Sequence, residues 1–241
     1  MRKVQKFNIE GNILDKTRQA GLWSDGQPLR LHLGCGEQHF DGYINIDYQP
    51  SEHTVQTKTA ADIFADITTL DFPEQSVDEI RLHHVFEHFN RPKALALLIK
   101  WHEWLKIEGK LHIETPDIVG CAKLLVSNLP YRMKQAILRH CFGSHEADWA
   151  YHLDGWYDEK YRYILKKLGF NVECRSWHWE KEPFLANVEA IAIKYVHMSR
   201  EDLISVADEI LQDSMVADVS SEREMYGIWC REMRSFIGKN T

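Results

Sequence analysis

The chain has few cysteines, and none of them are arranged in pairs. The five cysteines are scattered along the sequence: Cys35, Cys121, Cys141, Cys174 and Cys230. A disulfide framework or a zinc ribbon needs cysteines at close, regular spacing, and no C-x-x-C motif occurs here. The sequence therefore argues against both, and we expect a cytoplasmic protein that works in a reducing compartment.

An excess of positive charge is also missing. The chain of 241 residues has 29 Lys and Arg against 36 Asp and Glu, a formal net charge of −7. Binding to nucleic acid relies on a basic surface, so this balance predicts no nucleic-acid partner. No apolar run reaches the ~18 residues of a membrane helix, and the first residues lack the apolar core of a secretory signal. We expect neither a membrane span nor a signal peptide.

What the sequence does contain is a series of short apolar runs interrupted by helical patterns. Apolar spacing typical of helices occurs at 90–109 and 157–170, where Gly109 and Gly169 are expected to end the helices. The last two apolar runs follow each other closely, which predicts an antiparallel pair at the end of the sheet. Strands bounded by Gly, Pro or Asp are predicted at 28–36, 42–47, 62–67, 77–85, 109–117, 171–179 and 187–196.

The pattern predicts one α/β domain with additions at both ends. We expect residues 1–27 to pack on the core, residues 28–197 to form the domain, and residues 198–241 to form a C-terminal helical extension. Residues 118–156 are too long for a plain connector, and we expect them to form a lid on the acceptor side. The extension has two amphipathic helices, which could fold back on the domain, form a homodimer or contact a partner of the same pathway.

A glycine turn lies at the end of the first strand, and the second strand ends on an acid. Gly34 and Gly36 allow a tight turn and a close approach of a ligand to the backbone. Asp47 could accept hydrogen bonds from two ribose hydroxyls, and Asp66, near the end of the third strand, from an adenine amino group. The motif G-C-G lacks the third glycine of the dinucleotide fingerprint, and Asp47 comes only eleven positions after Gly36, against ~20 in dinucleotide-binding folds. Adenosine without a pyrophosphate fits this spacing better than a nicotinamide dinucleotide.

With these motifs in order, the chain resembles class I S-adenosylmethionine-dependent methyltransferases. The segments "LHLGCGEQHFDGYINIDYQP", "ADITTLDFPEQSVDEIRLHHVFEHF" and "KWHEWLKIEGKLHIETPD" carry the resemblance, which covers roughly residues 28–196. More narrowly, they resemble the predicted methyltransferases associated with bacterial surface-polysaccharide biosynthesis. The resemblance implies a Rossmann-like seven-stranded methyltransferase sheet with an antiparallel last hairpin. It also implies S-adenosylmethionine as the cofactor.

The resemblance also assigns positions to the cofactor. It implies that the methionine part lies along the glycine turn, the ribose at the second strand end, the adenine at the third, and the sulfonium near the fourth. Cys35 is expected to pack a small side chain under the turn. The residues implied as cofactor contacts are Gly34, Cys35, Gly36, Asp47, Tyr48, Asp66, Ile67 and His83.

The motif "HVFEH" has a second interpretation. His84, Glu87 and His88 spell H-x-x-E-H, the inverted zinc-protease pattern, in which the ligands lie on one helix. Here a strand leads into His83, so we expect His84 at the strand end and His88 after a bend, without a metal. Glu87 and His88 could instead pair to fix the loop, or His84 could contact the cofactor or the acceptor.

The acceptor site is predicted in the aromatic segment 142–157. An oxygen acceptor must lose a proton, and histidine is the usual base. His152 and His84 are the candidate catalytic bases, and His152 is favoured because H-x-x-G-W recurs in the resembled group. Aromatic faces with polar edges could bind a sugar, or the same residues could simply pack the lid onto the sheet. The candidate acceptor contacts are His145, Trp149, Tyr151 and Trp156.

The sequence therefore predicts an S-adenosylmethionine-dependent methyltransferase that O-methylates a sugar or glycan intermediate. Three alternatives remain from the residues: a nicotinamide oxidoreductase, a zinc hydrolase that uses His84, Glu87 and His88, and a non-catalytic scaffold or regulatory subunit that keeps the fold. Fold alone does not choose the acceptor.

Overall fold

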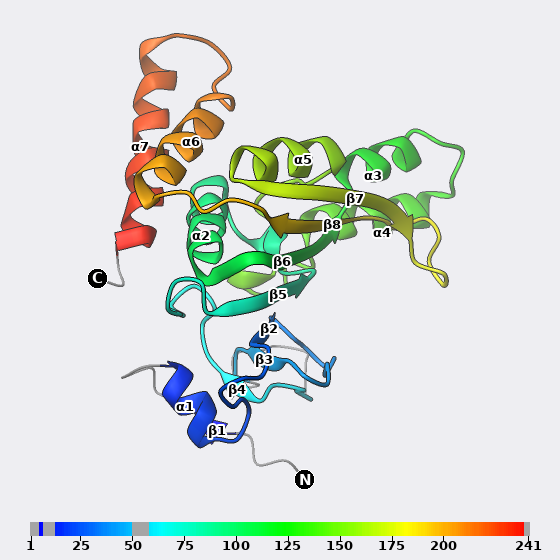
Figure 1. Cartoon of the computed structure of the whole chain (residues 1–241). Helices are drawn as coiled ribbons and strands as arrows, with labels where there is room; N and C mark the ends of the chain where they lie inside the picture. The colour runs from blue at the N-terminus through cyan, green and yellow to red at the C-terminus, as the bar shows by residue number, and fades with distance from the viewer. Residues whose placement is uncertain (1–4, 7–12, 50–57, 239–241) are drawn as a thin grey trace.

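A computed structural model of the protein describes residues 5–6, 13–49 and 58–238. Its centre is a twisted sheet of eight strands in the order β1-β4-β3-β2-β5-β6-β8-β7 (Figure 1). The strands are β1 (Gln5–Lys6), β2 (Arg30–Leu33), β3 (Ile44–Asp47), β4 (Ile63–Phe64), β5 (Val77–His83), β6 (Leu105–Pro116), β7 (Phe170–His178) and β8 (Ala186–Lys194). The seven predicted strands are all present, and the two-residue β1 adds one more at the edge beside β4.

One strand runs against the others. β8 pairs antiparallel with both β6 and β7, whereas all other pairs in the sheet are parallel. This confirms the predicted antiparallel hairpin and the Rossmann-like seven-stranded methyltransferase sheet. The strand order reverses on either side of β2, which lies between β3 and β5. In open parallel sheets such a switch point is where ligands bind, outside the carboxyl ends of the strands.

Helices lie on both faces of the sheet, and two more follow it at the C-terminus (Figure 1). The predicted lid, residues 118–156, contains α3, α4 and the short η3. The helices are α1 (Ile13–Gln19), η2 (Phe86–His88), α2 (Arg91–Trp104), α3 (Ile118–Leu125), α4 (Tyr131–Phe142), η3 (Asp148–Ala150), α5 (Asp158–Lys167), α6 (Arg200–Gln212) and α7 (Ser220–Ile237).

Helix α2 begins where the sequence predicts, but it ends earlier than predicted. The side chain of Asn90 caps the helix by accepting a hydrogen bond from the backbone N–H of Lys93 at 3.0 Å, as the sequence predicts. The helix ends at Trp104 and not at Gly109, because Leu105 pairs with Val77 and begins β6. Sheet pairing therefore overrides the helical spacing of the last turn, and the prediction for this boundary is wrong.

The described helices near both ends of the chain contribute residues to the main core. Ile13 of α1 belongs to the main hydrophobic core, as do Met233 and Ile237 of α7. Helix α7 lies along α2. The side chain of Asn90, at the start of α2, donates a hydrogen bond to Glu232 of α7 at 2.9 Å. The division of the chain at residues 28 and 198 stays a prediction. Among the described helices, none is both long and apolar enough to cross a membrane.

Candidate functional site

A cavity of about 770 Å³ lies at the carboxyl ends of β2, β3, β5 and β6. It is formed on one side by the turn after β2 and on the other by the ends of β5 and β6 together with aromatic residues of the lid and of β7. Its size falls within the range of about 300–1,000 Å³ that is common for small-molecule sites. The cavity coincides with the switch point, so the sheet places it where a nucleoside ligand is expected.

The turn Gly34–Cys35–Gly36 forms one wall of this cavity. The backbone N–H groups of Gly34 and Cys35 both donate to the carbonyl of Ile46, at 2.8 and 3.1 Å, which fixes the turn to β3. Gly34 and Gly36 have φ of 69° and 55°, in the left-handed region that glycine adopts most easily. A Cβ on Gly36 would meet nothing within 4 Å, so this glycine leaves open space on the cavity side.

Asp47 joins the end of β3 to the same turn. Its carboxylate accepts hydrogen bonds from the backbone N–H of Gly36 at 2.5 Å and of Tyr48 at 2.7 Å. The residue is 6% exposed and lines the cavity. The two backbone donors fix the carboxylate at the cavity wall, at the strand end where a ribose is expected. The observed cradle therefore fits an adenosine-containing cofactor.

Other predicted cofactor residues differ in their positions. Tyr48, Ile67 and His83 line the cavity with the glycine turn, whereas Asp66 does not. The carboxylate of Asp66 accepts hydrogen bonds from the N–H and the hydroxyl of Thr68, at 2.8 and 2.7 Å, and so closes a local turn. Burial raises the pKa of the Cys35 thiol, which therefore stays protonated and serves as a small packed side chain.

His83 is the last residue of β5, His84 follows it, and both line the cavity, but their charges differ. Burial and the nearby Arg81 lower the pKa of His83 to about 4. Burial lowers the pKa of His84 too, but the hydrogen bond with Glu114 and the contact with Glu87 outweigh it and raise the pKa to about 9. Its Nε2 lies 3.2 Å from the Glu114 carboxylate and its Nδ1 3.4 Å from that of Glu87. A ring that already holds its proton cannot take one from an acceptor, and the raised pKa therefore argues against His84 as a base.

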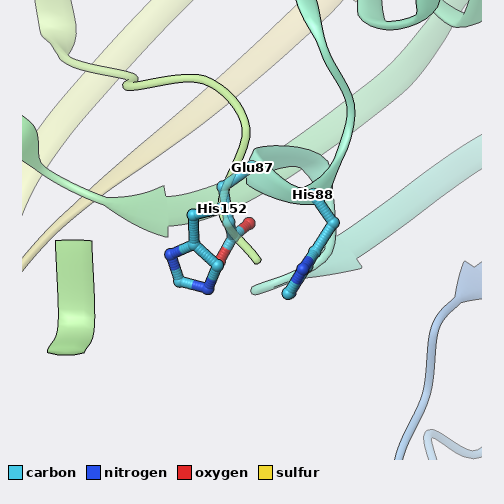
Figure 2. Close-up of side chains that lie close together, drawn as sticks. All are labelled: Glu87, His88 and His152. Atoms are coloured by element: carbon cyan, nitrogen blue, oxygen red, sulfur yellow. The ribbon is translucent and has the colours of Figure 1, made fainter. Parts of the chain in front are cut away.

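Three side chains form a second group at the edge of the cavity, shown in Figure 2: Glu87, His88 and His152. Glu87 and His88 come from η2, and His152 comes from the lid. The lid is held there because the backbone N–H of Leu153 donates to the carbonyl of Glu87 at 2.8 Å. Burial lowers the pKa of His152 to about 4, so its ring is neutral at neutral pH. Burial alone would raise the pKa of Glu87, but the neighbouring His84 outweighs it, so Glu87 stays ionised.

The H-x-x-E-H motif does not form a zinc-protease helix. Strand β5 ends at His83, and η2 is a single turn of 3-10 helix over Phe86–His88. His84 lies before this turn, with a positive φ of 52°. The predicted strand end and bend are therefore confirmed. The histidine that joins Glu87 and His88 is His152, and not His84.

The aromatic residues of the lid divide into two sets. Trp149 lines the cavity, as expected of an acceptor contact. Trp156 is 2% exposed and packs between Phe86 and Tyr161, with ring centroids 4.7 Å from each. The expectation that Trp156 contacts the acceptor is therefore corrected, because this ring is part of the core. His145 stacks on Tyr151 at 4.2 Å, and neither lines the cavity.

Sequence reasoning missed two tryptophans of the site. Trp177 on β7 and Trp179 just after it line the cavity, and the Trp179 ring lies 5.3 Å from His84 and 5.2 Å from His140. The signal was present in W-H-W, because alternate residues of a strand share one face. Lys93 of α2 and Glu114 of β6 also line the cavity without having been predicted.

Comparisons with known proteins point in the same direction. Residues 31–113, from β2 into β6, match the family described as methyltransferase domain. No curated protein matches the chain. Similar solved structures include a SAM-dependent methyltransferase from Methanosarcina mazei, with 14% identity, coverage of 73% of this chain and 96% of that chain, and a TM-score of 0.46. Another from Archaeoglobus fulgidus has 15% identity, 75% and 92% coverage and a TM-score of 0.46.

A further similar structure is the 1,6-didemethyltoxoflavin-N1-methyltransferase of Burkholderia thailandensis with bound 1,6-didemethyltoxoflavin and S-adenosylhomocysteine. It has 14% identity, covers 71% of this chain and 73% of that chain, and has a TM-score of 0.47. The matched family segment contains the glycine turn, Asp47, and His83 and His84 at the end of β5 and just after it. The family match and the sheet order together support a class I methyltransferase enzyme with S-adenosylmethionine as its cofactor.

Proposed function

We propose that the protein transfers a methyl group from S-adenosylmethionine to a hydroxyl of a sugar or glycan intermediate. The observation that carries this proposal is a single cavity with two different ends. One end has the glycine turn and Asp47, which suit adenosine, and the other has Trp149, Trp177 and Trp179 beside titratable side chains. A cytoplasmic location and a role in polysaccharide synthesis stay predictions.

The chain's own residues would position the cofactor. Asp47 would accept the ribose hydroxyls, while Tyr48 and Ile67 would lie against the adenine. Gly36 would let the methionine part lie close to the backbone. When bound, S-adenosylmethionine supplies an electrophilic methyl group, so the protein mainly has to align the acceptor and exclude water. The aromatic residues near His84 lie at the acceptor end of the cavity, where they would align the acceptor and exclude water.

The acceptor end of the cavity contains side chains that can take up the proton of the acceptor hydroxyl. The acceptor oxygen forms a bond to the methyl carbon, the carbon–sulfur bond breaks with its electron pair on sulfur, and the hydroxyl proton leaves. We assign its uptake to the His88–His152 pair, where the ring centroids are 4.7 Å apart and His152 is unprotonated. Tryptophan faces stack well on the apolar face of a sugar ring, which favours a sugar over a small charged acceptor.

Calorimetric titration with S-adenosylmethionine tests the cofactor assignment. We expect wild-type protein to bind at micromolar Kd and Asp47→Ala to weaken binding at least tenfold, because the ribose loses its acceptor. Asp41→Ala is the matched control, because the Asp41 side chain is 95% exposed, and it should bind as wild type does. Release of S-adenosylhomocysteine with nucleotide-linked or lipid-linked sugars then tests the acceptor class. Folded wild-type protein that does not bind would favour the non-catalytic scaffold.

A further inference from the structure

We propose that Glu87, His88 and His152 bind one divalent transition-metal ion at the acceptor end of the cavity. Each residue offers one ligand atom, and these atoms all lie within 4.8 Å of one another. In Figure 2 the carboxylate of Glu87 lies between the two imidazole rings. Two imidazoles and one carboxylate are a donor set that suits Zn²⁺, Fe²⁺ or Mn²⁺ and leaves coordination positions open.

Glu87 is the observation that points to a ligand. It is 2% exposed, and neither carboxylate oxygen has a hydrogen bond within the described part of the chain. Its closest contact is Nδ1 of His84 at 3.4 Å, and Nε2 of His152 lies 3.9 Å away. The ion pair of Oε1 with His84 offsets part of the cost of burying this carboxylate, but Oε2 has no partner within the described part of the chain. Coordination of a cation would satisfy that oxygen.

The two histidines are arranged as metal ligands usually are. Nδ1 of His88 donates to the backbone carbonyl of Tyr151 at 3.1 Å, which leaves the lone pair on Nε2. Such a hydrogen bond fixes the tautomer and the orientation of a metal-binding imidazole. Among the described residues, none forms a hydrogen bond with Nδ1 of His152, and its Nε2 faces Glu87. Either ring can therefore offer a neutral nitrogen.

The geometry requires a small closure. Ligand atoms ~2.1 Å from a tetrahedral zinc ion stand roughly 3.4 Å apart. The Nε2–Oε1 separation of 3.9 Å for His152 and Glu87 is close to this value. The ligand atoms now lie within 4.8 Å of one another, so a small movement of the loop that carries His152 would complete the site. His88 lines the cavity, which gives the ion a path of entry.

The use of the metal rests on the proposed function, whereas its binding does not. With an ion bound, both rings would serve as its ligands and not as the base assigned above. The ion would instead lower the pKa of a coordinated acceptor hydroxyl, so that the proton leaves to solvent. This would explain why a buried carboxylate and two histidines meet next to a methyl-transfer cavity.

The test is zinc binding by the full-length protein, measured without any methylation assay. After removal of metal with a chelator, the protein is titrated with Zn²⁺ in competition with a chromophoric chelator, and bound metal is counted by mass spectrometry. We expect one Zn²⁺ per chain, and at least 100-fold weaker binding for Glu87→Gln and for His152→Asn. His178→Asn removes an exposed histidine at the end of β7 and should bind as wild type does.

Two controls keep the outcomes distinct. Circular dichroism and thermal unfolding show whether each variant folds, and His152→Asn serves if Glu87→Gln does not fold. Calorimetry with S-adenosylmethionine is run on the same samples, so loss of cofactor binding is recognised separately from loss of metal. The proposal is overturned if folded wild-type protein binds no stoichiometric Zn²⁺. It is equally overturned if both variants bind Zn²⁺ as tightly as wild type does.

Discussion

Gly34 and Gly36 occupy the same turn, but a side chain would meet different surroundings at each. A Cβ on Gly34 would collide with the side chain of Val85, whereas a Cβ on Gly36 would stand in open space at the cavity. Both have positive φ, which costs a residue with a side chain about 1–2 kcal/mol. We therefore expect a side chain at Gly34 to disturb mainly folding, and a side chain at Gly36 to disturb mainly ligand binding.

We expect Gly34→Ala to lower stability clearly more than Gly36→Ala does. Gly36→Ala should lower the free energy of unfolding by about 1–2 kcal/mol and weaken S-adenosylmethionine binding, because the new methyl group occupies the cavity wall. Denaturant unfolding gives the stabilities, and calorimetry gives the affinities. Equal stabilities for the two variants would contradict the contact between Gly34 and Val85.

At the same scale, sequence reasoning succeeded where a residue lies at the end of a strand or directly after it. Gly34, Asp47 and His83 were found because parallel strands bring their carboxyl ends to one edge. The sequence identified His152 as a candidate but did not predict that it lies beside Glu87. The two residues are 65 positions apart, and a backbone hydrogen bond between η2 and the lid brings them together. Trp156 was assigned to the acceptor because burial of an aromatic ring cannot be read from the composition of a loop.

Among the elements, α7 is the one whose role the sequence left most open. Its amphipathic pattern allowed intramolecular packing, a homodimer or a partner surface. In the structure Met233 is fully buried within the main core, whereas Ile228 on the same helix is 50% exposed. The buried face of α7 is therefore part of the fold, and any partner would have to use its exposed face.

This difference gives a test of the helix. We expect Met233→Ala to lower the free energy of unfolding by about 2–5 kcal/mol, because a buried side chain is removed and a cavity remains. Ile228→Ala is the matched control and should change stability by less than about 0.5 kcal/mol. Chemical denaturation of both variants decides the matter. Similar small effects would mean that α7 does not pack on α2 in solution.

Element boundaries were harder to predict than element types. Seven strands and the capped start of α2 follow from apolar runs, glycine positions and Asn90. The end of α2 was misplaced because apolar spacing continues past Trp104, and only pairing of Leu105 with Val77 turns the chain into a strand. The local sequence pattern therefore predicts whether a helix or a strand forms, whereas contacts between residues distant in sequence determine where that element ends.

Over the whole molecule, several histidines are buried in uncharged form. Burial is the main reason that the pKa values of His32, His83 and His102 are lowered to about 4. An unfolded chain would hold these rings near pKa 6.5. Between pH 6.5 and 4 the unfolded state therefore binds protons that the folded state does not, and acidification over this range favours unfolding.

His102 allows this dependence to be measured away from the cavity. Its ring is fully buried, donates from Nε2 to the carbonyl of Val196 at 3.1 Å and packs edge to face on Phe170. The neighbouring Lys194, a positive charge, also lowers the pKa of His102, and His197 adds to this effect. No carboxylate is among the groups that shift this pKa, so nothing opposes the loss of stability when the ring is protonated except its hydrogen bond to Val196.

We expect the free energy of unfolding of wild-type protein to fall as the pH is lowered from 6.5 to 4. Each buried histidine contributes a slope of up to about 1.4 kcal/mol per pH unit. His102→Gln can keep a donor to Val196 but cannot titrate, so its stability should fall less steeply over the same range, even if it starts lower. His178→Gln, at an exposed ring, should follow the wild-type slope. Urea unfolding at four pH values measures these slopes, and an unchanged slope in His102→Gln would show that His102 is not among the groups that make the fold sensitive to acid.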